Sequence, residues 1–330
     1  DDIGGDTLLS MDEIASKING LPKGRVPMAC DKVTAFVDIQ KALLFYAVVA
    51  WSDDFTGAVL DYGAWPEQHS RLFSLATANP TIQIKFPNAG LEGGIYAALE
   101  ALLNDLLGRE WEREDGAMLK IERAMIDANW GASTDIVYQF CRQSSWSGIL
   151  CPSHGRYVGA SSKPMTDYRK QPGDKLGFNW MMPNVAGKRA IRHVIYDSNF
   201  WKSFVHARLA VVLGDKGCLS LYGRHPQLHQ LLAEHLTAEY RVKTVGRGRT
   251  VDEWKIRPNR SDNHWLDCLA GCAVCGSMLG ATLPEFGTAT PLKRRGAPVK
   301  LSDIQKNIQS SSVNRPTRAK IRLSDLRKEK

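Results

Sequence analysis

Hydrophobic positions in the first fifth of the chain fall into three short apolar runs. The runs cover residues 33–39, 43–51 and 56–62, and they are rich in β-branched and aromatic side chains. Polar turns at residues 40–41 and 52–55 separate them. Strand-forming runs joined by such turns are typical of antiparallel hairpins. The pattern therefore predicts a three-strand antiparallel meander.

Further along the chain, runs with the period of a helix alternate with short strand-like runs. The predicted helices cover residues 95–107, 133–142, 199–209, 226–238 and 262–279. The predicted strands cover residues 118–127, 148–152, 191–196 and 219–222, and residues 239–245 and 251–256 are expected to pair as a basic hairpin. This order predicts an α/β fold whose mixed central sheet is flanked by helices.

Composition divides the chain into three regions. Residues 1–30 are polar with Gly and Pro interruptions, and we expect a linker or arm there. Residues 31–285 carry the predicted sheet and helices as one domain. Residues 286–330 are rich in Pro, Ser, Thr, Lys and Arg, which is typical of a flexible tail. Residues 155–185, rich in Gly, Ser, Lys and Pro, are expected to form a long loop.

Three acids stand where buried structure is predicted. Asp38 ends the first strand, and Asp127 ends the strand over residues 118–127. Asp267 lies near the start of the last helix, three residues after His264 and on the same helix face. An ionised group in a central strand costs several kcal/mol, on the order of 3–5, unless something pairs with it. A bound metal ion is a common explanation for such a carboxylate.

Placed at one edge of a sheet, these acids predict a metal-dependent nuclease site. Asp38, Asp127 and Asp267 would hold two divalent cations about 3.5–4 Å apart. Carboxylate oxygens favour hard cations, so Mg²⁺ or Mn²⁺ is expected. His264 is expected to position the attacking water, assist a proton transfer or add a ligand. The alternative for His264 is a structural histidine in the core or at the helix cap.

Net charge is concentrated at the C-terminal end. The chain carries +8, whereas residues 286–330 hold 12 Lys and Arg against 3 Asp and Glu, a charge of +9. The first 285 residues therefore carry −1. A basic tail favours an acidic partner such as nucleic acid, although a solvated end explains it equally well. The predicted loop is also basic, since it contains Lys163, Arg169, Lys170 and Lys175, and it could face nucleic acid or simply be solvated.

The seven cysteines indicate a reducing compartment rather than a disulfide framework. Cys268, Cys272 and Cys275 share one face of the predicted last helix with small apolar residues. We interpret them as buried packing residues and not as metal ligands. No apolar run approaches the roughly 20 residues that cross a bilayer. The N-terminal residues lack an initiator Met and a signal-peptide pattern, so the chain reads as part of a longer polypeptide.

Four blocks of residues, in order between about 31 and 280, resemble one known family. They are Phe36-Val37-Asp38-Ile39-Gln40 with Leu60-Asp61-Tyr62-Gly63, Ala124-Met125-Ile126-Asp127 with Val137-Tyr138-Gln139-Phe140-Cys141-Arg142, Leu236-Thr237-Ala238-Glu239-Tyr240, and Asn263-His264-Trp265-Leu266-Asp267-Cys268. The blocks resemble the nuclease domain of large terminase subunits of tailed phages, of the lambda type. The resemblance implies an RNase H-like fold and two-metal endonuclease activity on concatemeric double-stranded viral DNA.

The same resemblance implies the partners and the setting. A terminase nuclease works with the terminase small subunit, the portal protein and the ATPase domain of its own polypeptide, in the host cytoplasm and away from membranes. We find no Gly-x-x-x-x-Gly-Lys-Ser/Thr loop in these 330 residues, so we expect the ATPase motor to be absent from this chain. His264 matches a position that is histidine in only some terminases.

Two other functions are compatible with the same acids. A transposase or integrase domain of this fold would join DNA strands as well as cut them. A docking module would hold DNA or the portal protein and use no catalysis. A product assay separates the first from a nuclease, and an acid-to-amide variant at Asp38 separates the second.

Overall fold

The computed structural model describes most of the chain. The described residues are 8–129, 131, 134–185, 191–260 and 262–283. All of them belong to one compact unit, residues 1–289. A second unit, residues 290–330, and the predicted tail over residues 286–330 lie outside the described residues.

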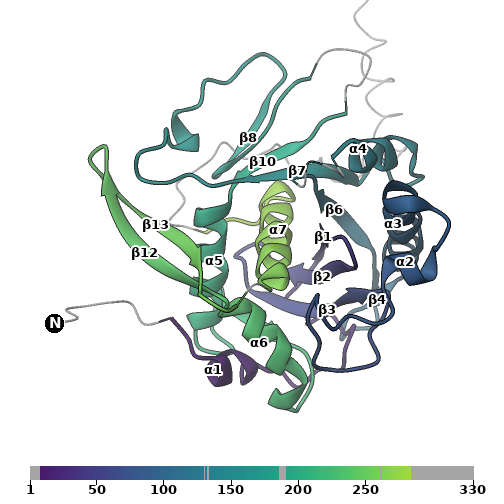
Figure 1. Ribbon diagram of the computed structural model, residues 1–330. Helices are drawn as coiled ribbons and strands as arrows, with labels where there is room; N and C mark the ends of the chain where they lie inside the picture. Colours follow the sequence, from purple (N-terminus) through teal and green to yellow (C-terminus); the bar gives the residue numbers. More distant parts are fainter. Residues whose placement is uncertain (1–7, 130, 132–133, 186–190, 261, 284–330) are drawn as a thin grey trace, which may run out of the picture. The chain divides into compact units, whose positions relative to one another are not determined.

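A nine-stranded sheet lies in the middle of this unit (Figure 1). Its strand order is β11 (Leu219–Leu221), β3 (Gly57–Trp65), β2 (Leu44–Trp51), β1 (Lys32–Ile39), β6 (Ile121–Asp127), β7 (Leu150–Arg156), β10 (Val194–Asp197), β9 (Trp180–Met182) and β8 (Lys175–Gly177). Strands β1, β2 and β3 are antiparallel, whereas β6, β7 and β10 continue from β1 in parallel. The predicted meander and mixed sheet are confirmed.

Helices cover both faces of the sheet. They are α1 (Met11–Ala15), α2 (Ile82–Lys85), α3 (Gly90–Gly108), α4 (Thr134–Gln143), α5 (Ser198–Ala210), α6 (Gln230–Leu236) and α7 (His264–Met278), with 3₁₀ turns η1 (Met165–Asp167) and η2 (Pro226–His229). Helix α7 packs on β1, β2 and β6, and α5 and α6 lie beside it (Figure 1). Helices α2, α3 and α4 pack together at the other face.

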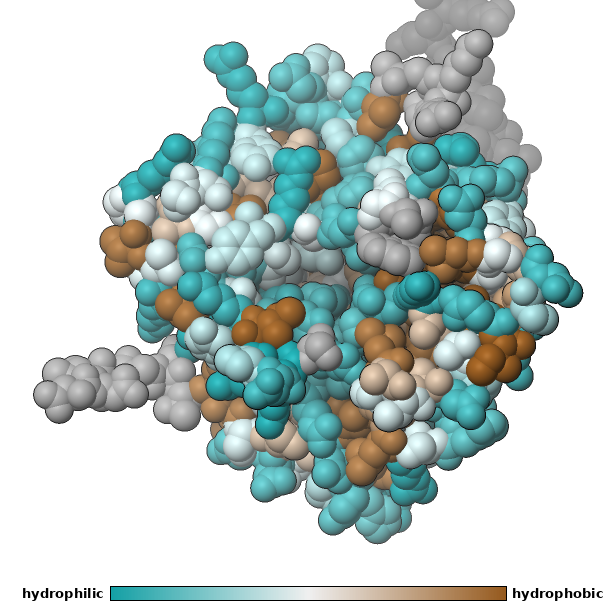
Figure 2. Space-filling view, in the orientation of Figure 1, coloured by the Kyte–Doolittle hydropathy of each residue, from teal (hydrophilic) through white to brown (hydrophobic). Residues whose placement is uncertain are grey.

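Two short strand pairs lie outside the large sheet. Strands β4 (Trp111–Glu112) and β5 (Met118–Leu119) form one pair, and β12 (Glu239–Gly246) and β13 (Arg249–Ile256) form the predicted hairpin. In Figure 1 the hairpin projects beside α5. Figure 2 shows a largely hydrophilic face with hydrophobic side chains in small separate areas. Within the described residues, no helix is long and apolar enough to cross a membrane.

Side-chain alternation along the strands decides which residues meet α7. Phe36 and Met125 belong to the core on the α7 face, while Val37 and Ile126 belong to the core on the α3 face. Because successive strand side chains point to opposite faces, the residues two positions beyond Phe36 and Met125 also point toward α7. Those residues are Asp38 and Asp127.

Several predicted elements differ from the structure. The strand predicted over residues 118–127 is two strands, because β5 pairs with β4 and only β6 joins the large sheet. The loop predicted over residues 155–185 contains the end of β7 and the strands β8 and β9. These strands form because β9 pairs with β10 and extends the sheet edge. The segment predicted as one helix over residues 226–238 is η2 followed by α6.

The described part of the predicted N-terminal arm packs on the same unit. The capping box between Ser10 and Glu13 begins α1. Ile14 is fully buried, and the Leu221 amide donates to the Lys17 carbonyl over 2.8 Å. Ile18 pairs with Leu221 of β11, and Val26 pairs with Arg113 beside β4. The described part of this segment is therefore packed on the domain, whereas the sequence predicts a linker.

Candidate active site

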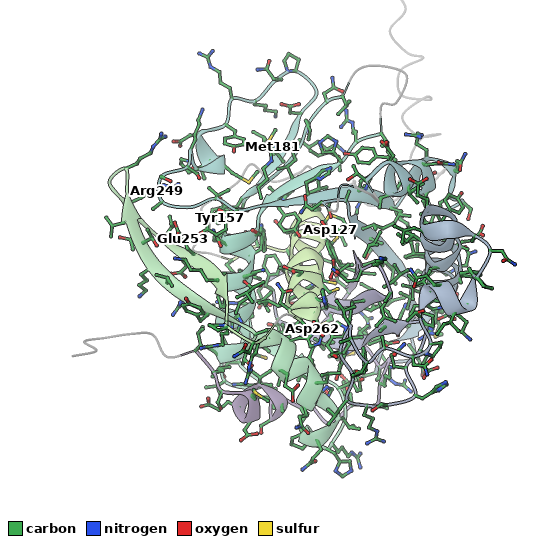
Figure 3. The ribbon with its side chains drawn as sticks, viewed as in Figure 1. Asp127, Tyr157, Met181, Arg249, Glu253 and Asp262 are labelled. Carbon is green, nitrogen blue, oxygen red and sulfur yellow. The ribbon has the colours of Figure 1, made fainter. Side chains whose placement is uncertain are left out.

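The ends of two parallel strands bring the first two acids together. Strands β1 and β6 pair with Val37 opposite Ile126, and the next residue on each strand is Asp38 or Asp127. Neighbouring strands lie about 4.8 Å apart, so the two carboxylates project side by side. Figure 3 shows Asp127 next to α7. Asp38 is buried, with 5% of its surface exposed.

Helix α7 carries the third acid and the histidine in its first turn. The His264 Nδ1 lies 2.7 Å from Asp38 Oδ2, and the Gln40 Nε2 donates to the same oxygen over 3.1 Å. The His264 ring stacks on Phe45 with centroids 4.3 Å apart. These contacts orient the carboxylate of Asp38, so the structure joins two of the residues that the sequence singles out.

Asp267 lies between two donors that the sequence analysis did not identify. The Lys202 Nζ lies 2.9 Å from Asp267 Oδ1, and the Asn263 Nδ2 donates to Asp267 Oδ2 over 3.1 Å. Glu239, at the start of β12, accepts from the same Lys202 ammonium over 2.5 Å and from Asn263. The four side chains form one hydrogen-bonded cluster around Asp267.

The ionisation of these acids shows that they share one site. Burial, then the charge of Asp38, then that of Asp267 raise the pKa of Asp127 to about 8. Burial also raises the pKa of Asp267; Lys202 opposes this effect, and Asp38 and Glu239 add to it. Carboxylates disfavour one another's charge in this way only at short range. Asp38, Asp127 and Asp267 therefore form an electrostatically coupled group.

Two opposing effects act on His264. Burial lowers its pKa, but the hydrogen bond to Asp38 and the charge of Asp38 outweigh burial, so the net pKa is raised. Its Nε2 is buried and makes no hydrogen bond within the described residues; Asp262 Oδ1 lies 3.9 Å from it. The hydrogen bond to Asp38 therefore holds the ring at Nδ1, whereas Nε2 on the opposite side of the ring makes no hydrogen bond within the described residues.

As they stand, the described residues include no group of three or more His, Cys, Asp or Glu side chains arranged to hold a metal ion. In this arrangement Lys202 and Asn263 engage Asp267, and His264 engages Asp38. The donor set nevertheless fits a hard divalent cation. It consists of carboxylate oxygens whose mutual repulsion a cation relieves.

Three other observations concern these elements. Asp197 caps α5 by accepting from the Phe200 amide over 3.1 Å, which is a structural role. All seven cysteines are buried free thiols, and those of α7 pack in the core as predicted. Helix α7 begins at His264 with Asn263 as its N-cap residue, two residues after the predicted start at residue 262.

Lys202 is the residue whose signal in the sequence was missed. It lies in Phe200-Trp201-Lys202-Ser203-Phe204-Val205, where its neighbours along the helix are mostly apolar. A lone lysine on the buried side of a helix requires a counter-charge. That pattern predicts an acid nearby, but it does not say which acid. Glu239 lies in one of the sequence blocks that resemble the terminase nuclease family, but the sequence assigns it no role.

The fold and the acids together define a class of protein: α/β domains with a mixed sheet and clustered carboxylates at the ends of adjacent strands. Comparison with family models makes this specific, because residues 5–284 match the terminase large subunit gpA endonuclease domain. The match spans most of the chain. The protein belongs to this family and is an endonuclease domain.

Comparison with solved structures finds a similar chain from a bacterial virus. It is a mutant nuclease domain of the large terminase subunit gp2 of bacterial virus Sf6, solved with manganese. The two chains are 14% identical, with a TM-score of 0.38, over 81% of this chain and 98% of that one. No curated protein sequence matches this chain.

Proposed function

We propose that this endonuclease domain hydrolyses phosphodiester bonds of double-stranded DNA at the site formed by Asp38, Asp127 and Asp267. Two divalent cations, Mg²⁺ or Mn²⁺, would be held by these three carboxylates. The observation that carries the proposal is the convergence of three acids from β1, β6 and α7. Burial and then the charges of Asp38 and Asp267 raise the pKa of Asp127 to about 8. Such a concentration of buried negative charge is costly without a cation.

The residues of the proposed site have different roles. When bound, divalent cations activate a water molecule and offset negative charge on the scissile phosphate. Asp38 and Asp127 present their carboxylates from rigid neighbouring strands, and Asp267 presents its own from the first turn of α7. His264 holds Asp38 through Nδ1, and its buried Nε2 is placed to exchange a proton on the far side of the ring.

Membership of the terminase family makes DNA the substrate and viral packaging machinery the setting. Beyond that, we propose that the chain cuts concatemeric viral DNA at the start and end of packaging, in the host cytoplasm. The terminase small subunit, the portal protein and an ATPase domain of the same polypeptide are the partners we propose.

Plasmid cleavage tests the site. The wild-type chain is incubated with supercoiled plasmid and Mn²⁺, Mg²⁺ or EDTA, beside Asp38→Asn, Asp127→Asn and Asp267→Asn. We expect cutting that requires metal and falls at least about 100-fold in each variant, because each substitution removes one ionised ligand. Mn²⁺ calorimetry on the same proteins should show weakened binding.

Asp197→Asn is the matched control. Asp197 is a buried acid at the end of β10, a parallel strand that β7 separates from β6, and Asn caps helices about as well as Asp. We expect this variant to cut like the wild type. Metal binding without cutting would support a docking module, and joined rather than cut products would support strand transfer. Full activity in Asp38→Asn would refute the site.

A further inference from the structure

A buried lysine lies inside the acidic site. The Lys202 side chain is 11% exposed, and its Nζ contacts Asp267 Oδ1 at 2.9 Å and Glu239 Oε1 at 2.5 Å. Lys202 comes from α5, which packs along α7, so its place beside Asp267 is set by the contact of two long helices. Its pKa is raised, because the charges of Asp267 and Glu239 outweigh the effect of burial.

The two partners of Lys202 differ in what surrounds them. Asp267 is coupled to Asp38 and Asp127, where the proposed cations belong. Glu239 is buried, with 3% of its surface exposed, and its carboxylate accepts hydrogen bonds from Lys202 and Asn263. Lys202 therefore bridges Asp267 to Glu239, a second acid whose charge also acts on Asp267.

We propose that Lys202 is a built-in counter-cation that competes with divalent metal for Asp267, and that Glu239 limits this competition by holding the ammonium. The proposal rests on the proposed function, since it concerns the same site. Lys202 acts as a positioning residue, because it acts through Asp267 and not on the substrate.

Electrostatics sets the direction of each effect. A positive charge a few ångströms from a divalent cation weakens its binding, and inside a protein such an interaction changes affinity by at least about tenfold. The ammonium neutralises Asp267 when no metal is bound. When a cation reaches Asp267, the contact with Glu239 still satisfies the ammonium, so the lysine is not left as an unpaired buried charge.

Isothermal titration calorimetry with Mn²⁺ tests the proposal at fixed pH. Glu239→Gln removes the carboxylate that shares the Lys202 ammonium with Asp267, so the ammonium should compete more strongly for Asp267. We therefore expect Mn²⁺ to bind about tenfold more weakly. Lys202→Met removes the competing charge, so Mn²⁺ should bind about tenfold more tightly. Lys202→Arg keeps the charge and should remain within about threefold of the wild type.

Lys32→Met is the matched control for losing a buried lysine. The Lys32 side chain is also 11% exposed and pairs with two carboxylates, Asp31 at 2.7 Å and Asp53 at 2.6 Å. Lys32 is the first residue of β1, whereas Asp38 lies near the other end of the same strand. We expect Lys32→Met to lower the melting temperature and leave Mn²⁺ affinity unchanged.

Glu239→Gln keeps the test decisive if Lys202→Met does not fold, since Gln preserves the shape and one hydrogen-bonding oxygen. Weaker Mn²⁺ binding in Lys202→Met, or unchanged or tighter binding in Glu239→Gln, would overturn the proposal. These results differ from a failure of the proposed function, in which the wild-type chain itself binds no Mn²⁺.

Discussion

At the scale of a single residue, burial and neighbouring carboxylates make the ionised form of Asp127 unfavourable. The pKa is raised to about 8 in the folded protein, above its ordinary value of 3.8. Between these two values the folded state binds more protons than the unfolded state, so stability falls as pH rises. Metal-free protein should therefore lose stability through this window.

Asp127→Asn tests this effect directly, because Asn resembles the protonated acid at every pH. In EDTA the variant should unfold at nearly the wild-type temperature at pH 4.5. At pH 8 it should be more stable by at least about 1 kcal/mol, or about 2–4 °C. Thermal unfolding followed by circular dichroism from pH 4.5 to 8.5 measures the difference.

Asp197→Asn provides a comparison with a different window. Burial raises the pKa of Asp197 to about 6, so the gain in stability of this variant should level off above pH 6. An Asp127→Asn difference that is the same at pH 4.5 and pH 8 would show that the acid is not held protonated by its neighbours.

At the scale of elements, the β12–β13 hairpin and the segment after β7 form one surface. The Arg249 Nη2 donates to the carbonyls of Gly159 over 2.8 Å and Ser162 over 2.5 Å. Glu253 Oε1 accepts from the Ala160 amide over 3.0 Å, and Figure 3 shows Arg249 and Glu253 on the hairpin near Tyr157. Hydrogen bonds therefore hold the β12–β13 hairpin against the basic segment that follows β7.

Exposed cations on this surface should contribute to DNA binding. Lys170, Lys243 and Arg247 are all exposed, so replacing the three with Ala should weaken binding and remove up to three phosphate contacts. The slope of log affinity against log salt should become shallower by about 2–3. Fluorescence anisotropy with a short DNA duplex, over a salt series, measures both quantities.

The matched control replaces three exposed lysines elsewhere, Lys41, Lys85 and Lys120. It removes the same charge from residues around α2 and the β4–β5 pair. If both triple variants shift the salt slope equally, then net charge and not the hairpin surface explains the binding.

At the scale of the whole molecule, the charge of the chain is divided between body and tail. Residues 286–330 hold 12 Lys and Arg and 3 Asp and Glu, whereas the rest carries a net −1. Deleting these residues should weaken DNA binding by at least about tenfold at low salt and reduce its salt dependence. Mn²⁺ affinity should not change. Equal DNA affinity with and without the tail across a salt series would contradict this prediction.

Much of the fold was predictable because short-range patterns encode it. The apolar runs before and after residues 40–41 and 52–55 specify the meander, and strand alternation places Asp38 and Asp127 on one face. The apolar remainder of α7 indicates a helix that packs on the sheet. Gly271 permits close approach, since a Cβ there would collide with the Phe36 ring.

What the sequence determined by itself is which residues form each strand and helix and which face each acid occupies, because these depend on neighbours within a few positions. Tertiary structure alone decided the rest. Only packing of α5 against α7 brings Lys202 to Asp267. Only the β12–β13 hairpin places Glu239 on the other side of that lysine. Only pairing with β10 turns part of a polar loop into β9. Partners far apart in sequence are chosen by long-range packing, which no local pattern contains.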